Sequence, residues 1–162
     1  MEWLSPALRP ALAESLRQRR WRLATAESCT GGLIAAACTD LAGSSDWFER
    51  GFVTYSNESK TELLGVPAAL IETHGAVSQP VAEAMARGAL AHAHAEVAVA
   101  VTGIAGPGGG SPTKPVGLVW MAWALPGRVW SECQVFVGDR AAVRAQTVSH
   151  TLGQLQAAVA AA

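Results

Sequence analysis

The sequence predicts a three-layer α/β/α sandwich around a mixed sheet. Patterns typical of helices and strands interleave along most of the 162 residues, which favours helices on both faces of a sheet. Two strand patterns then follow one another across a Pro126-Gly127 turn, which predicts an antiparallel hairpin in that sheet. Half of the residues are apolar. With this length, we expect a single domain over residues 1–162 with a substantial core.

Six segments are predicted to be helices: residues 6–19, 30–41, 58–65, 67–75, 79–94 and 139–158. The first has leucines at every fourth residue, and the last carries one apolar stripe. The second comes directly after a strand and is expected to hold Gly31 and Gly32 in its first turn. The fifth follows Ser78, a suitable N-terminal cap, and has Pro80 in its first turn.

Five segments are predicted to be strands: residues 21–27, 50–56, 96–104, 118–125 and 129–137. The second contains β-branched and aromatic residues, which suit a strand. The third, EVAVAVTGI, is almost continuously apolar, which predicts a strand buried on both faces of the sheet. The last two form the hairpin, and Trp120 and Trp123 should fall on opposite faces of the sheet.

Composition argues against several classes of protein. Twelve basic and 13 acidic residues give a net charge of −1, so direct nucleic-acid binding is not expected. The three cysteines show neither metal-ligand spacing nor a disulfide framework, and we expect no metal or other cofactor. Neither a signal peptide nor a membrane-spanning stretch is evident. We therefore expect a cytoplasmic protein that does not enter a membrane.

The first candidate site is AESCTGGLIA, residues 26–35, at a strand-to-helix junction. Backbone N–H groups of Thr30, Gly31 and Gly32 would point at one spot there. The positive end of the helix dipole would then favour an anion or a developing oxyanion. The alternative is plain helix capping, with the two glycines serving only packing.

Three nucleophiles compete in this segment: Ser28, Cys29 and Thr30. A thiol is intrinsically the strongest, but it usually needs a histidine partner, and none is near in the sequence. A serine can instead be activated by a lysine that has lost its proton through burial. Such a serine would sit beside its oxyanion donors, as in a nucleophile elbow.

The second candidate is TYSNESK, residues 54–60, with the only tyrosine and one of the two lysines. Lys60 would lie in the first turn of a helix, where the dipole lowers its pKa as a general base requires. Tyr55 could donate to the hydroxyl or relay its proton. Ser56 or Asn57 would cap the helix. The alternative is that Tyr55 is half-buried strand filler and Lys60 a solvated surface charge.

The third candidate is the glycine-rich segment TGIAGPGGGSPTKPVG, residues 102–117, which follows the third strand. Ligands of α/β sheets bind beyond the carboxyl ends of strands, and a glycine-rich loop there can wrap a phosphate with its N–H groups. The alternative is an ordinary flexible loop. The glycines before Pro115 are Gly103, Gly106, Gly108, Gly109 and Gly110.

The fourth candidate is Arg140, at the start of the last helix. A cation is unfavourable at a helix N-terminus unless an anion shares the site. A ligand phosphate is one such anion, and the carboxylates of Asp139 and Glu132 are the alternatives. Arg140 is therefore a candidate substrate-binding residue.

The sequence resembles the CinA C-terminal domain family over about residues 5–158. The resemblance lies in the order and spacing of TAESCTGG, GSSDWFERGFVTYSNESK, HGAVS, TGIAGPGGG with KPVG, and GDR. It implies a stand-alone nicotinamide-nucleotide amidase, which hydrolyses nicotinamide mononucleotide to nicotinate mononucleotide and ammonia in pyridine nucleotide recycling. It also implies a homodimer, and it assigns Ser28 as nucleophile with Tyr55 and Lys60 as its partners. The same resemblance implies that the substrate is contacted by Thr102, Gly103, Gly106, Gly108 and Gly109, with Arg140 near it.

A serine amidase mechanism follows from this resemblance. Ser28 would lose its proton toward Lys60, directly or through Tyr55, and attack the carboxamide to form an acyl-enzyme. Three alternatives stay open. The protein could be a non-catalytic nucleotide-binding or protein-interaction module linked to competence and DNA uptake. Cys29 could be the nucleophile, or the substrate could be another small amide.

Overall fold

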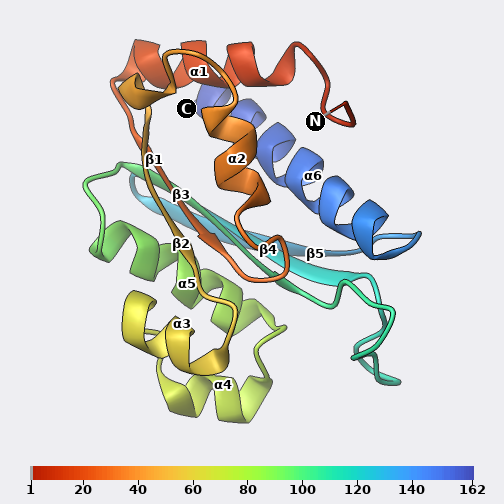
Figure 1. Ribbon diagram of the computed structural model, residues 1–162. Coiled ribbons are helices and arrows are strands. Elements are labelled where there is room, and N and C mark those ends of the chain that lie inside the picture. Colours follow the sequence, from red (N-terminus) through yellow and green to blue (C-terminus); the bar gives the residue numbers. More distant parts are fainter. Residues whose placement is uncertain (1) are drawn as a thin grey trace.

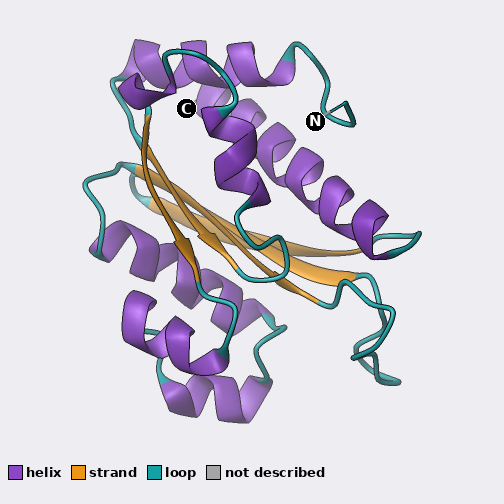
Figure 2. Ribbon diagram, viewed as in Figure 1, coloured by secondary structure: helices purple, strands orange, loops and turns teal. Residues whose placement is uncertain are grey.

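The computed structural model describes residues 2–162 and confirms the three-layer α/β/α sandwich. Figures 1 and 2 show a central sheet with helices on both of its faces. The strands are β1 (Leu23–Glu27), β2 (Phe48–Val53), β3 (Val97–Gly103), β4 (Leu118–Leu125) and β5 (Arg128–Val135). The helices are α1 (Leu8–Arg19), α2 (Leu33–Thr39), α3 (Asn57–Leu64), α4 (Ala68–His74), α5 (Gln79–Ala91) and α6 (Arg140–Ala161).

The sheet is mixed, as predicted, with the strand order β2-β1-β3-β4-β5. The strands β2, β1 and β3 are parallel, and β4 and β5 form the antiparallel hairpin. Glu27 at the end of β1 pairs with Val53 at the end of β2 and with Val101 near the end of β3. The segments that follow these three strands therefore emerge at one edge of the sheet, where α/β proteins bind ligands.

Two apolar clusters hold the layers together, one on each face of the sheet. One joins the sheet to α1, α2 and α6, and the other joins it to α3, α4 and α5. Strand β3 supplies valines to the first cluster and Ala98 and Ala100 to the second, and it is buried on both faces as predicted. Trp123 and Trp120 lie in the first and second clusters respectively, which confirms that they face opposite sides.

Two details of the predicted helices are wrong. Helix α2 is shorter than expected, and Gly31 and Gly32 lie before it with φ angles of +58° and +106°. Glycine tolerates these left-handed conformations, so this pair makes a tight turn instead of a helical one. Ser78 does occupy the N-cap position of α5, but its hydroxyl donates to Gly75 O and accepts no helical N–H.

Within residues 2–162, no helix combines the length and apolar character needed to cross a membrane.

Candidate active site

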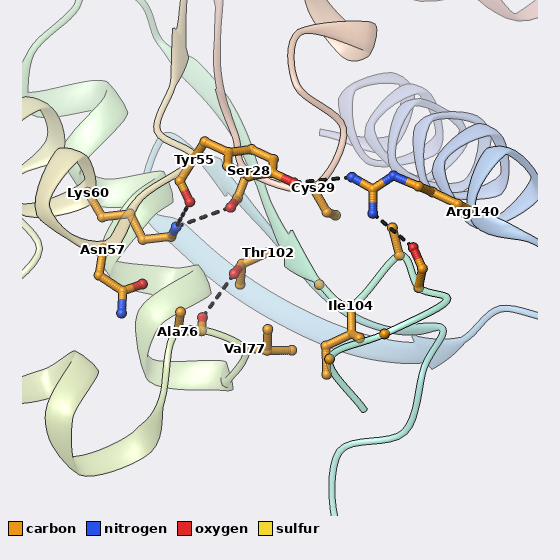
Figure 3. Close-up of a pocket in the computed structure, with 15 residues that line it drawn as sticks. Ser28, Cys29, Tyr55, Asn57, Lys60, Ala76, Val77, Thr102, Ile104 and Arg140 are labelled. Carbon is orange, nitrogen blue, oxygen red and sulfur yellow. Dashed lines mark hydrogen bonds between the residues drawn. The ribbon is translucent and has the colours of Figure 1, made fainter. Parts of the chain in front are cut away.

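A cavity of about 290 Å³ lies at the edge of the sheet where the parallel strands end. Its walls come from the β1–α2 turn, the start of α3, the α4–α5 loop, the β3–β4 loop and the first residue of α6. Figure 3 shows Ser28 and Lys60 on one side of it and Arg140 on the other. The sequence candidates that line the cavity are Ser28, Cys29, Tyr55, Lys60, Thr102, Gly103, Gly106, Gly108, Gly109 and Arg140.

Ser28 and Lys60 meet on one face of the sheet. Side chains alternate along a strand, and Ala24 and Ala26 of β1 face the α3–α5 layer, so Ser28 continues that row. Helix α3 belongs to the same layer, and its start is fixed by Ser56, whose hydroxyl accepts a hydrogen bond from Ser59 N at 3.1 Å. Lys60 Nζ consequently lies 3.1 Å from Ser28 Oγ.

Lys60 is buried, with only 1% of its surface exposed. The alternative that it is a solvated surface charge is therefore wrong. Burial in this environment lowers the pKa of the Lys60 amine below its ordinary value of 10.5. No carboxylate of residues 2–162 lies within salt-bridge distance to oppose that effect. Burial is the largest cause of the lowered pKa.

Three oxygen atoms surround Lys60 Nζ. Its N–H groups donate to Ser28 Oγ at 3.1 Å, to Thr54 O at 2.9 Å and to Tyr55 O at 3.3 Å. When the amine loses its third proton, two N–H groups are enough for the two carbonyl oxygens, which only accept hydrogen bonds. The lone pair of the neutral amine can then accept a hydrogen bond from the Ser28 hydroxyl. This is the arrangement that a general base needs before it takes a proton.

Cys29 is poorly suited to be the nucleophile. It is only 6% exposed, and burial raises the pKa of its thiol to about 11. The reactive form of cysteine is the thiolate, which such a pKa disfavours at neutral pH. Within the described residues, no histidine lines the cavity to activate the thiol. The geometry therefore favours Ser28 over Cys29.

Tyr55 and Arg140 meet across the mouth of the cavity. Arg140 Nη2 donates to the Tyr55 hydroxyl at 3.1 Å, and Nη1 donates to Gly106 O at 2.9 Å. The Tyr55 side chain is exposed, with 61% of the residue's surface accessible, so it is not strand filler. Its hydroxyl is thus bonded to the arginine, while Lys60 reaches Ser28 without it.

The two carboxylates considered as partners of Arg140 are engaged elsewhere. Asp139 caps α6 by accepting from Ala142 N at 2.9 Å. Glu132 pairs with His150. In the described chain, Arg140 makes no salt bridge to any carboxylate. Its guanidinium therefore keeps a positive charge at the cavity that a ligand anion can neutralise.

The end of β3 and the β3–β4 loop form one wall of the cavity. Thr102 and Gly103 of β3 line it, and so do Gly106, Gly108 and Gly109 of the loop. Contact of these residues with a substrate stays a prediction. A Cβ at Gly103 would come within 2.6 Å of the Val119 side chain, so a larger residue would push these strands apart. Glycine at this position therefore allows the close pairing of β3 and β4 beside the cavity.

Thr30, Gly31 and Gly32 do not line the cavity, and the expected cluster of free N–H groups is not seen there. The Thr30 side chain is fully buried and donates to Glu27 Oε1 at 2.5 Å. Gly31 N donates to Ser28 O. A direct contact of these three residues with substrate stays a prediction.

Sequence reasoning missed Glu27 and Arg144, which hold the turn that carries Ser28. Arg144 donates to Cys29 O and to Thr30 O, both at 3.1 Å. Two signals could have pointed to them. Glu27 is a lone carboxylate at the end of an apolar strand, and Arg144 stands one helical turn after Arg140.

Within residues 2–162, no group of three or more His, Cys, Asp or Glu side chains lies close enough together to hold a metal ion.

Comparisons with known proteins identify the family. The CinA C-terminal domain matches residues 6–159. The chain belongs to this family. It is 59% identical over 144 residues to nicotinamide-nucleotide amidohydrolase PncC of Pseudomonas putida, with 89% of this chain and 90% of that protein covered. A protein of the same name from Shigella flexneri is 53% identical over 147 residues, with 89% and 88% covered.

Solved structures of the CinA superfamily have the same fold as this member. A crystal structure of a competence-damaged protein (CinA) superfamily protein from Klebsiella pneumoniae matches it with a TM-score of 0.92 and 40% identity. The match covers 96% of this chain and 98% of that one. Such a match over nearly the full length confirms the predicted CinA-like architecture.

Proposed function

We propose that this CinA-family protein is a nicotinamide-nucleotide amidase. It hydrolyses nicotinamide mononucleotide to nicotinate mononucleotide and ammonia, a step in pyridine nucleotide recycling. The observation that carries the proposal is the buried Lys60 amine 3.1 Å from the Ser28 hydroxyl inside a cavity. The names of the relatives at 59% and 53% identity support the substrate.

The acylation step uses Lys60 as base and then as acid. Neutral Lys60 takes the proton of Ser28 directly while Oγ attacks the carboxamide carbon. The tetrahedral intermediate collapses as the C–N bond breaks, and Lys60 returns the proton to the departing ammonia. The product is a nicotinoyl ester on Ser28. Water then attacks this ester, again giving a proton to Lys60, and the acid product leaves with Ser28 restored.

The oxyanion of the intermediate needs hydrogen-bond donors near Ser28. Cys29 lines the cavity, and its backbone N–H donates to no backbone carbonyl in the part of the chain described. The N–H of the residue after the nucleophile serves this purpose in nucleophile elbows. We assign it the same role here, where one donor contributes about 3 kcal/mol.

The phosphate of the substrate is held at the other side of the cavity. Arg140 carries a charge without a carboxylate partner there, and the glycine-rich loop offers backbone N–H groups beside it. A substrate with its carboxamide at Ser28 and its phosphate at Arg140 would span the cavity. Tyr55 would close over it through its bond to Arg140.

The deciding experiment is ammonia release from nicotinamide mononucleotide by the purified protein, beside Ser28→Ala and Lys60→Ala. Activity in the parent and its loss in both folded variants supports the proposal. A parent that binds the nucleotide without releasing ammonia supports the binding-module alternative instead. If a substrate panel shows ammonia release only from a different small amide, the protein is an amidase with that amide as its substrate.

Three further expectations stay predictions: a single amidase domain, a homodimer and a cytoplasmic location.

A further inference from the structure

A fully buried carboxylate adjoins the nucleophile in the chain and takes no part in the mechanism above. Glu27 has no exposed surface, and it does not line the cavity. We propose that Glu27 is a positioning residue whose carboxylate holds the β1–α2 turn so that Ser28 Oγ points at Lys60. This inference rests on the proposed amidase function.

The carboxylate is held by three donors from the turn and the helix after it. Thr30 Oγ1 donates to Oε1 at 2.5 Å, Ile34 N donates to Oε1 at 2.8 Å, and Ala35 N donates to Oε2 at 3.0 Å. No arginine, lysine or histidine of residues 2–162 forms a salt bridge with Glu27. The partners of the buried carboxylate are therefore one hydroxyl and two backbone N–H groups, which meet the requirement that buried polar groups be hydrogen-bonded.

The position of Glu27 connects both halves of the catalytic pair. Alternation along β1 places the Glu27 side chain under α2 and the Ser28 side chain on the opposite face, next to α3. The backbone carbonyl of Glu27 accepts from Thr54 N at 2.8 Å, and Thr54 O in turn accepts from Lys60 Nζ. The residue is thus bonded to the segment of the nucleophile and to the segment of the base.

A change at Glu27 should therefore act through Ser28. All three groups that face the carboxylate are donors, so both of its oxygens must accept. A glutamine would turn an NH₂ group toward one of these donors and force the turn to shift. A displacement of about 1 Å at a reacting atom costs about 100-fold in rate. Substrate affinity should change little, because Glu27 does not reach the cavity.

The first test compares Glu27→Gln with Glu62→Gln, an exposed glutamate on α3. For each we would measure kcat and KM for nicotinamide mononucleotide, and the rate at which a fluorophosphonate probe labels Ser28 without substrate. We expect a fall in kcat of about 100-fold in Glu27→Gln with KM within about twofold, and a parallel fall in labelling rate. Glu62→Gln should match the parent in all three.

A second pair covers the case in which Glu27→Gln does not fold. Thr30→Val removes one donor and keeps the side-chain shape, whereas Thr30→Ser keeps the donor. We expect Thr30→Val to lower kcat and the rate of Ser28 labelling. In Thr30→Ser, both should stay close to the parental values. Parental kcat and labelling in folded Glu27→Gln, or in Thr30→Val, would overturn the proposal, and so would a higher KM with unchanged kcat. Failure of the amidase function itself would show separately, as a parent that Ser28 probes label but that releases no ammonia.

Discussion

Lys60 Nζ lies 3.1 Å from Ser28 Oγ, although 32 positions separate the two residues in the chain. The parallel pairing of β1 with β2 brings them together, because the segments after both strands leave the same edge of the sheet. Lys60 is buried and makes no salt bridge to a carboxylate of residues 2–162. A lysine whose pKa is lowered by burial can act as the base for a serine where no histidine is present.

Replacing Lys60 by methionine should abolish most of the activity while the protein stays folded. Methionine matches the length of the lysine stem and removes the base, and general-base catalysis contributes about 10³-fold to a rate. We expect kcat to fall by that order, with an unchanged circular dichroism spectrum. Lys60→Arg should not rescue it, because a guanidinium does not give up its proton. Parental kcat in folded Lys60→Met would show that another group takes the proton of Ser28.

The rate should rise with pH as Lys60 loses its proton. Burial lowers the pKa of this amine below 10.5, and only the neutral form accepts the Ser28 proton. The rising limb of a kcat/KM profile, which reports the free enzyme, should therefore have its midpoint below 10.5. The direction of this change in kcat/KM is fixed, because protonation of Lys60 at lower pH removes the base. A profile that falls with pH over the same range would contradict the assignment.

Much of the site was predictable because motifs at the ends of parallel strands must converge. Periodicity and turn residues place Ser28 directly after one strand, Thr102 near the end of another and Lys60 in the first helix after a third. The position of the N–H groups of residues 30–32 is not predictable in this way. It depends on the left-handed conformations of the two glycines and on the bond from Gly31 N to Ser28 O. Burial of Lys60 depends likewise on tertiary packing, because it requires the segment after β1 to cover the amine.

Cysteine alkylation should leave the enzyme active. Cys133 is exposed, whereas Cys29 and Cys38 are buried and burial raises the pKa of both thiols. Iodoacetamide should therefore label Cys133 first, as mass spectrometry of the intact protein and its peptides would show, with ammonia release unchanged. Cys133→Ser is the control and should take up little label over the same time. A folded but inactive Cys29→Ala protein would instead make that thiol the nucleophile.

Removal of the Tyr55 hydroxyl should have a smaller effect than removal of the Lys60 amine. The hydroxyl is bonded to Arg140, and Lys60 contacts Ser28 without it. We expect Tyr55→Phe to lose about tenfold in kcat/KM, the order expected for one hydrogen bond to a charged group. The measurement is steady-state ammonia release beside Lys60→Met. A fall in kcat as large as that of Lys60→Met would show that the proton passes through Tyr55.

Arg140 should discriminate substrates by their phosphate. Without a carboxylate partner in the described chain, its guanidinium is placed to bind an anion at the cavity. A charge-assisted hydrogen bond of about 2 kcal/mol predicts that Arg140→Met raises KM for nicotinamide mononucleotide by about 30-fold.

The matched control for Arg140 is a substrate that lacks the phosphate. Nicotinamide riboside should be a poor substrate of the parent, and its kcat/KM should change little in Arg140→Met. The difference between the two substrates isolates the phosphate contact from any general damage to the site, such as loss of the bond to Gly106 O. An equal loss for both substrates would mean that Arg140 shapes the β3–β4 loop and that the phosphate is bound elsewhere. In that case the backbone N–H groups of Gly108 and Gly109, which line the same cavity, become the candidates for binding the phosphate.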